Sequence, residues 1–424
     1  MKPGFYTIIA AQFFSSLADN ALLIAAIALL GEALPDDVSW MSPMLKWTFV
    51  LSYVLFAAFV GAFADAIPKG QVMLLANTIK IGGCLFLILG LHPLVAYALV
   101  GFGAAAYSPA KYGILTELLP PEQLVAANGW IEGTTVTSII LGTLTGGALV
   151  SVPAAHFLAK VTPPFVCSTA EMAMFVIMLA YVIAAVINAF IPNTGVDHRI
   201  PSKNPLFLAR EFSRCVRLLW QDRLGQISLA TTTLFWGAGA TLQFIVLDWA
   251  AQALGFSLSK ASMLQGVVAI GIAIGAVFAA SAISLRNSLK VLPLGAAMGI
   301  VTMALVFVHH LYVAIALLIL IGILAGFFVV PMNALLQHRG HVLMGAGHSI
   351  AVQNFNENIG IMAMLSLYAA MVHSDFSVTT AIVLFGAFLA AAMGLIIIKH
   401  ARNQARGDSL HLIGMEKPKE RSSL

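Results

Sequence analysis

The sequence predicts an all-α membrane protein that crosses a bilayer about twelve times, and three observations support this. Of its 424 residues, 60% are hydrophobic and only 9% are charged, whereas a soluble domain is roughly 25% charged. Apolar runs of about 18 to 25 residues recur along the chain, and about 20 such residues span a ~30 Å hydrocarbon core. A transmembrane barrel would show strands of ~10 residues with alternating polarity, but residues 172–191 are apolar throughout except for Asn188. These observations exclude soluble enzymes, nucleic-acid-binding proteins and disordered scaffolds.

The polar breaks between apolar windows place the spans in order. The first window is long, contains Asp19 and is followed by further apolar runs, so we expect an uncleaved span and not a signal peptide. Lys and Arg concentrate on one side when the N-terminus is placed inside, which predicts that both termini lie in the cytoplasm. The expected spans lie near 5–30, 44–66, 72–91, 94–119, 123–150, 172–192, 226–250, 262–284, 290–309, 311–336, 346–373 and 377–399.

A long basic segment after the sixth span divides the chain into two weakly similar halves. Pro109 in span four recurs as Pro331 in span ten, and Glu132 in span five recurs as Glu357 in span eleven. Matched Pro and Glu residues suggest a duplicated six-helix unit, and two parallel six-span halves form the major facilitator architecture. We therefore predict an N-terminal half over 1–192, a basic cytoplasmic linker over 193–225, a C-terminal half over 226–399 and a cytoplasmic tail over 400–424.

Ionisable residues within the spans are the first candidates for solute binding, since each costs about 2.5–3.5 kcal/mol on insertion scales. Asp19 and Asn20 lie about 21 Å along span one, at 1.5 Å per residue, and so deep in the bilayer. Asp19 could bind a cationic head-group, a proton or sodium, or it could instead pair with a neighbouring helix. Lys80 lies near the inner end of span three and could snorkel to the membrane surface.

Span four carries Lys111 just after Pro109, which should kink the helix. The Lys111 ammonium could meet a phosphate or carboxylate of the solute, or it could form a salt bridge to Glu132 on the next span.

Spans ten and eleven carry amides beside a further carboxylate. Asn333 occupies the position of Lys111 in the second half, and Gln353 and Glu357 share one helical face. These groups could bond a polar head-group, or they could only link helices, which is worth about 0.6 kcal/mol on average.

The loop between spans two and three contains Asp65 and Lys69 among glycines, in a pattern that resembles the major facilitator loop signature. Such a loop latches helices on the cytoplasmic side, so we expect these two residues to form part of a gate. No Walker motif, HExxH or nucleophile elbow occurs. Cys84, Cys167 and Cys215 are widely spaced, which predicts neither a disulfide framework nor a metal site. We expect a transporter with no catalytic residue, cofactor or metal.

Several strings resemble the bacterial lysophospholipid transporter family. They are Gln-Phe-Phe-Ser-Ser-Leu-Ala-Asp-Asn-Ala-Leu-Leu over 12–23, Gly-Ala-Ala-Ala-Tyr-Ser-Pro-Ala-Lys-Tyr-Gly-Ile-Leu over 103–115, Phe-Trp-Gly-Ala-Gly over 235–239, Phe-Phe-Val-Val-Pro over 327–331 and Ala-Val-Gln-Asn over 351–354. The likeness covers about residues 8–398, and the tail after Lys399 lies outside it.

The resemblance implies an inner-membrane flippase that carries mono-acylated glycerophospholipids inward by alternating access. Typical substrates would be lysophosphatidylethanolamine and lysophosphatidylglycerol, re-acylated by a cytoplasmic-side acyltransferase or acyl-ACP synthetase that would be the expected partner. One departure is Gln243 in span seven, where the family is expected to have Arg. This shifts the expected phosphate-binding role towards Lys111. Two alternatives remain open: a major facilitator exporter of amphipathic drugs or other small solutes, and a non-transporting membrane protein that scaffolds the acyltransferase.

Overall fold

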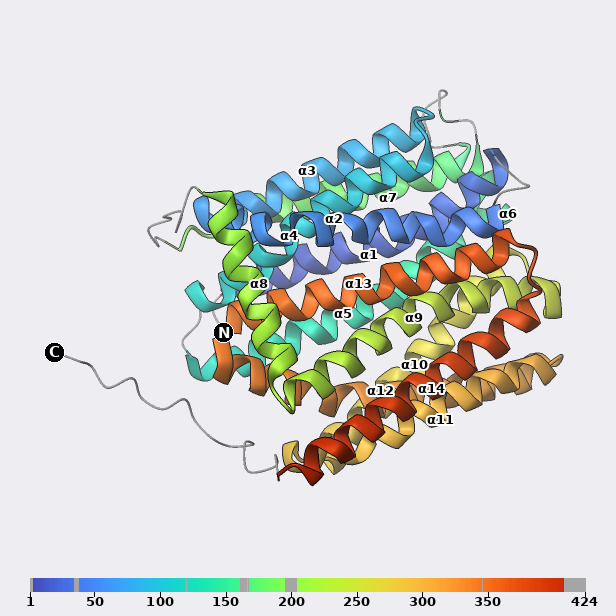
Figure 1. The fold of residues 1–424 in the computed structure, drawn as a ribbon. Coiled ribbons are helices and arrows are strands. Elements are labelled where there is room, and N and C mark those ends of the chain that lie inside the picture. Colours follow the sequence, from blue (N-terminus) through green and yellow to red (C-terminus); the bar gives the residue numbers. More distant parts are fainter. Residues whose placement is uncertain are drawn as a thin grey trace.

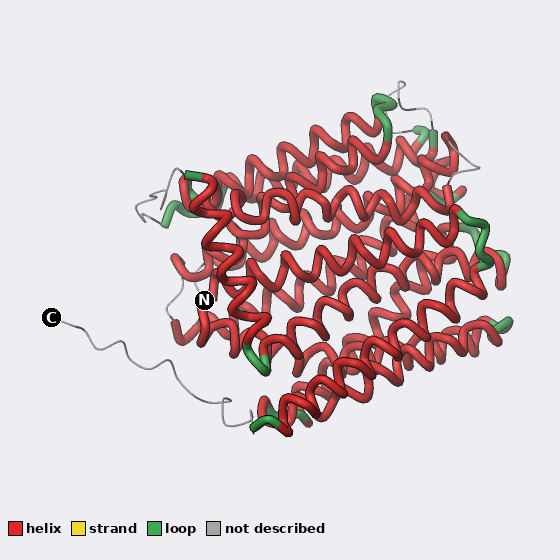
Figure 2. The backbone as a smooth tube through the Cα atoms, viewed as in Figure 1, coloured by secondary structure: helices red, strands yellow, loops and turns green. Residues whose placement is uncertain are grey.

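The computed structural model describes residues 3–33, 38–118, 121–160, 166, 168–194, 204–344 and 346–407. These residues form a bundle of long helices that run side by side (Figures 1 and 2). Within this described part of the chain, eleven helices are long and apolar enough to cross a membrane, or up to 12 if a pair bent by 76° counts as one span. The predicted all-α class with about twelve spans is confirmed. Helices suit this environment because their backbone hydrogen bonds are satisfied within each segment.

The first part of the chain contains seven helices, of which the short α6 forms the bent pair with α5. They are α1 (Pro3–Ala33), α2 (Val38–Ala66), α3 (Lys69–Ile88), α4 (Pro93–Leu118), α5 (Pro121–Leu149), α6 (Val152–Leu158) and α7 (Thr169–Ala189). The segment predicted as a basic linker contains α8 (Pro205–Gln221), which runs across the ends of the other helices (Figure 1).

The second part of the chain completes the bundle. It contains α9 (Gly225–Leu254), α10 (Leu258–Ala282), the 3-10 helix η1 (Leu285–Val291), α11 (Leu292–Met303), the 3-10 helix η2 (Ala304–Phe307), α12 (Leu311–Met344), α13 (Ala346–His373) and α14 (Val378–Ala405). The start of α1 and the end of α14 lie on the same side of the bundle, which we call the terminal side (Figure 1).

Close packing of α10 against α12 follows from glycines spaced four residues apart on both helices. Gly271 and Gly275 of α10 face Gly322 and Gly326 of α12, and a Cβ atom on any of them would overlap the facing backbone. Small residues at this spacing let transmembrane helices approach closely, where association depends on van der Waals packing. The outer surface, by contrast, exposes large apolar side chains such as Phe307 and Leu395, as expected of a surface that faces lipid.

The two parts of the bundle touch at the end away from the terminal side. Trp40, at the start of α2, lies with its ring centroid 5.1 Å from that of His373, at the end of α13. Gly147, at the end of α5, packs against Ser262, near the start of α10. We call this end the far side, and these contacts join the two parts there.

Candidate functional site

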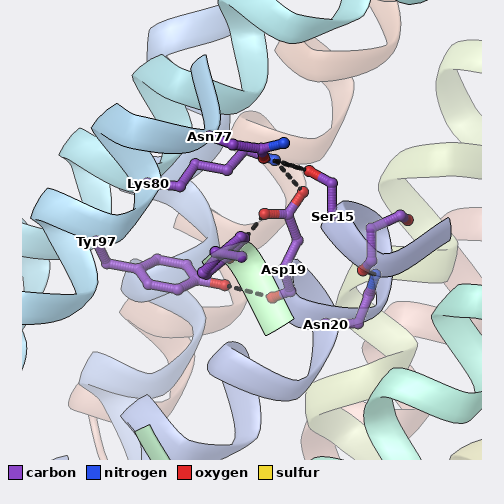
Figure 3. A network of polar contacts seen from close by, with 8 residues as sticks. Ser15, Asp19, Asn20, Asn77, Lys80 and Tyr97 are labelled. Carbon is purple, nitrogen blue, oxygen red and sulfur yellow. Dashed lines mark hydrogen bonds and ion pairs between the residues drawn. The ribbon is translucent and has the colours of Figure 1, made fainter. Parts of the chain in front are cut away.

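A polar cluster lies inside the first part of the bundle and centres on Asp19 of α1. Its Oδ2 atom accepts a hydrogen bond from Lys80 Nζ of α3 at 2.7 Å, and its Oδ1 atom accepts one from the Tyr181 hydroxyl of α7 at 2.8 Å. Lys80 Nζ also donates to Ser15 Oγ at 3.0 Å, and Ser15 in turn donates to Asn77 Oδ1 at 2.7 Å. Figure 3 shows how α1 and α3 bring these side chains together.

The cluster is shielded unevenly. The Lys80 side chain is 2% exposed, whereas that of its partner Asp19 is 18% exposed. The ammonium is therefore enclosed among helices while part of the carboxylate stays accessible. The rings of Tyr107 and Tyr181 lie 5.2 and 5.6 Å from Lys80 Nζ, as ring centroid distances. Aromatic faces at this range attract a cation, and together with Asp19 they offset the cost of burying Lys80.

The geometry bears on two expectations for this cluster. The prediction that Lys80 snorkels is wrong: its ammonium points inward because Asp19 lies within ion-pair distance on the adjacent helix. Asp19 pairs with Lys80 of α3, and because its carboxylate is also 18% exposed, binding of a solute by Asp19 stays a prediction. Asn20 does not join the cluster, since its Nδ2 atom donates to the backbone carbonyl of Ser16, one turn back along α1, at 2.8 Å (Figure 3).

Sequence reasoning missed four members of this cluster, namely Asn77, Lys80, Tyr97 and Tyr181. Tyr97 of α4 donates its hydroxyl hydrogen to the backbone carbonyl of Asp19 at 3.4 Å. One signal was available: a buried carboxylate needs a cation in reach, and Lys80 and Lys111 were the two lysines well inside the predicted spans of the first half.

A second polar cluster lies in the C-terminal part and unites three predicted residues. Gln353 Nε2 donates to Glu357 Oε1 at 2.7 Å, within α13, and to Asn333 Oδ1 of α12 at 3.2 Å. Gln353 and Glu357 are each 8% exposed. The amide thus joins two helices and also holds the carboxylate, so the predicted shared face is correct.

Gln243 of α9 connects the two parts of the bundle. Its Oε1 atom accepts a hydrogen bond from Lys46 Nζ of α2 at 3.2 Å, and its backbone carbonyl accepts one from Gln265 of α10 at 2.8 Å. The position at which the family is expected to have Arg thus holds the Gln243 amide, and the ammonium of Lys46, from the first part of the bundle, contacts this amide.

The remaining predicted residues lie towards the terminal side. Lys111 of α4 places its ammonium 4.4 Å from the ring centroid of Tyr112. The side chains of Glu132 and Asp65 lie outside the described residues, so the Lys111–Glu132 salt bridge stays a prediction.

Lys69, at the start of α3, is 5% exposed and forms an ion pair with Glu117, at the end of α4, at 3.3 Å. It also donates to the Ala64 carbonyl at 3.0 Å. Lys69 therefore ties the loop between α2 and α3 to α4, which is the kind of contact that a latch requires.

Among the residues that the structure describes, no group of three or more His, Cys, Asp or Glu side chains could hold a metal ion. The first part of the bundle offers an accessible carboxylate over a buried ammonium, and the second part offers a carboxylate beside amides.

Comparison with known proteins agrees with this architecture. The family model described as Major Facilitator Superfamily matches residues 8–363. Among solved structures, a bacterial homologue of the human lysosomal transporter Spinster, inward-facing and occupied, has a TM-score of 0.68 at 15% identity, covering 95% of this chain and 99% of that one. The POT family transporter PepTSo has a TM-score of 0.69 at 13% identity, covering 96% of this chain and 99% of that one. At such identities these likenesses establish the fold.

Curated relatives are much closer in sequence. The lysophospholipid transporter LplT of Yersinia pestis (strain Pestoides F) is 44% identical over 366 residues, which is 86% of this chain and 86% of that protein. LplT of Yersinia pseudotuberculosis serotype I (strain IP32953) matches to the same extent. The chain therefore belongs to the major facilitator superfamily and, within it, to the family of the lysophospholipid transporters LplT.

Proposed function

We propose that this protein moves lysophospholipids such as lysophosphatidylethanolamine inward across a bacterial inner membrane by alternating access. The observation that carries the proposal is the 44% identity to LplT over 86% of both chains. Membership of the major facilitator superfamily favours movement of a solute over its chemical conversion.

The two polar clusters suit a charged head-group. The accessible Asp19 carboxylate would attract the ammonium of an ethanolamine head, while Glu357 and its bonded amides, Gln353 and Asn333, offer a second polar surface. Lys111, half-buried on α4, is the cation that we assign to the lipid phosphate. We place Asn20, Glu132 and Gln243 along the same route, and Asp65 with Lys69 at its cytoplasmic gate.

Alternating access needs one end of the route to close while the other is open. Here the contacts of Trp40 with His373 and of Lys46 with Gln243 join the two parts towards the far side. We infer that the far side is the periplasmic side and that the terminal side, with both termini and α8, is cytoplasmic. The basic character of α8, with Arg210, Arg214 and Arg217 in one helix, supports this orientation.

A lipid delivered to the cytoplasmic side would next be re-acylated, so we infer an acyltransferase or acyl-ACP synthetase as the partner that consumes it. The transporter itself needs no bound cofactor in this scheme.

Competition during uptake tests the substrate class. Proteoliposomes with purified protein would take up labelled lysophosphatidylethanolamine, and we expect unlabelled lysophosphatidylglycerol to reduce the rate while tetraphenylphosphonium, a hydrophobic cation, leaves it unchanged. Inhibition by the cation and not by the lysolipid would instead favour an exporter of amphipathic drugs. A protein that only scaffolds the acyltransferase would give no uptake.

A further inference from the structure

Four polar atoms in the first part of the bundle are buried with no hydrogen-bond partner among the described residues. They are Asn77 Nδ2, the Tyr107 hydroxyl, and both Oδ1 and Nδ2 of Asn188. The three residues are 0%, 5% and 1% exposed, respectively. Leaving such a group unpaired costs about 1–3 kcal/mol, and native proteins commonly satisfy it with ordered water. Several unpaired atoms in one region therefore indicate water.

These atoms form a series that starts at the Asp19–Lys80 ion pair. Asn77 already accepts from Ser15 through its Oδ1 atom, and Ser15 contacts Lys80 Nζ. Tyr107, on α4, places its ring 5.2 Å from the same ammonium. Asn188, near the end of α7, interacts with the Tyr107 side chain, although neither of its amide atoms forms a hydrogen bond of good geometry.

The series ends at a pocket on the terminal side. This pocket, of about 210 Å³, lies among the ends of α3, α4 and α7, and Asn188 lines it together with Lys69, Gln71 and Thr194. A water needs only ≳10–15 Å³ of such volume and two to four polar partners. The pocket has room for several waters, and its lining includes the Asn188 amide, whose atoms have no hydrogen-bond partner among the described residues.

We propose that a chain of water molecules runs from this pocket past Asn188 and Tyr107 to Asn77 and the Asp19–Lys80 pair. Water would then reach the ion pair from two directions. One is the accessible side of Asp19, and the other is the pocket on the terminal side, through the first part of the bundle alone. The passage is independent of which solute the protein carries. Only its assignment to the cytoplasmic side rests on the proposed orientation.

The water chain gives the ion pair a route for proton exchange from the pocket. This route stays open when a lipid head-group covers Asp19, a situation that rests on the proposed function. From Lys69 to Lys80 the route covers eleven residues of α3, or about 16 Å at 1.5 Å per residue. Side chains alone do not bridge that length, so water is needed to link them. Three tyrosines contact the pair, namely Tyr97 and Tyr107 of α4 and Tyr181 of α7, and Tyr53 of α2 interacts with Asp19 electrostatically.

Thiol labelling tests the passage without measuring transport. In a cysteine-free background, Asn77→Cys places a thiol within the proposed water chain, and Ala76→Cys places one at the next residue, which is 1% exposed and packs in an apolar cluster with Val72 and Met73. We expect 2-aminoethyl methanethiosulfonate to label Asn77→Cys at least ten times faster than Ala76→Cys, because the reagent needs water to reach and ionise the thiol.

Blocking variants show which route the reagent takes. Asn188→Leu replaces a polar residue of the pocket lining with an apolar one. Leu74→Trp places a larger side chain in the pocket lining and leaves Asn77, Tyr107 and Asn188 unchanged. Either change should slow labelling of Asn77→Cys at least tenfold, whereas Asn188→Ala, which leaves space for water, should not. Equal rates for Asn77→Cys and Ala76→Cys, or rates that neither blocking variant lowers, would overturn the proposal. Leu74→Trp keeps the test valid if Asn188→Leu does not fold.

Discussion

Replacing Lys80 by Met should destabilise the protein strongly, because it leaves the Asp19 carboxylate in the bundle without its cation. Lys80 is 2% exposed on its side chain and contacts Asp19 at 2.7 Å. Removing one partner of a buried ion pair costs about 3–5 kcal/mol. The Tyr181 hydroxyl still donates to Asp19, so we expect the lower part of that range. Removing both charges, in Asp19→Asn with Lys80→Met, should cost less than the sum of the single changes by about 2–3 kcal/mol.

The assay is unfolding in mixed micelles by titration with sodium dodecyl sulfate, followed by the loss of helical circular dichroism. Lys260→Met is the matched control: it removes the same charge from an exposed position, and surface substitutions usually stay within about 0.5 kcal/mol. A Lys80→Met variant as stable as Lys260→Met would refute the reasoning, as would single changes whose effects simply add. The double variant should also be inactive in lipid uptake, because it lacks the Asp19 carboxylate that we propose to bind the lipid head-group.

Three further predictions concern other parts of the molecule. Gln353→Leu frees the Glu357 carboxylate from its amide, and we expect at least a tenfold lower uptake rate with unchanged size-exclusion behaviour; uptake at the wild-type rate would remove Gln353 from the route. Arg339→Ala breaks the paired contacts to Asp222 at 3.0 and 2.7 Å, and a loss of about 3–5 kcal/mol is expected in the same unfolding titration, so a change below 1 kcal/mol would contradict burial of this pair. Gly326→Val places a branched side chain against the facing backbone of α10, and purified yield and thermal stability should fall, whereas a stable Val variant would show that the glycine packing is not needed.

The helical spans were predictable from sequence because the bilayer imposes a simple rule of length and polarity. Each predicted window has a counterpart helix, and the differences have physical causes. Span five ends in a sharp bend near Ser151 and Pro153, which separates α5 from α6. The span near 290–309 starts and ends as 3-10 helix around α11. The linker after α7 is basic, as expected, and also folds into α8, which packs Cys215 and Leu219 against the bundle.

Pairing between distant spans was harder to predict than the spans themselves. Gln353 and Glu357 are four residues apart on one helix, so their contact follows from helical geometry alone. Lys80 and Asp19 come from different helices, and their contact depends on how α1 and α3 pack. Hydropathy places Lys80 near a membrane surface, but the carboxylate on the facing helix provides a better environment for its charge than snorkelling does.

Uptake of labelled lysophosphatidylethanolamine into proteoliposomes that contain only this protein tests the account most directly. Vesicles with wild-type protein, vesicles with Asp19→Asn and protein-free vesicles would be compared at equal reconstituted amounts and orientation. We predict rapid uptake with wild-type protein, and near protein-free rates with Asp19→Asn although it inserts normally. Uptake by wild-type protein no faster than in protein-free vesicles would contradict lysophospholipid transport, and equal rates for wild type and Asp19→Asn would contradict a role for the Asp19 cluster in it.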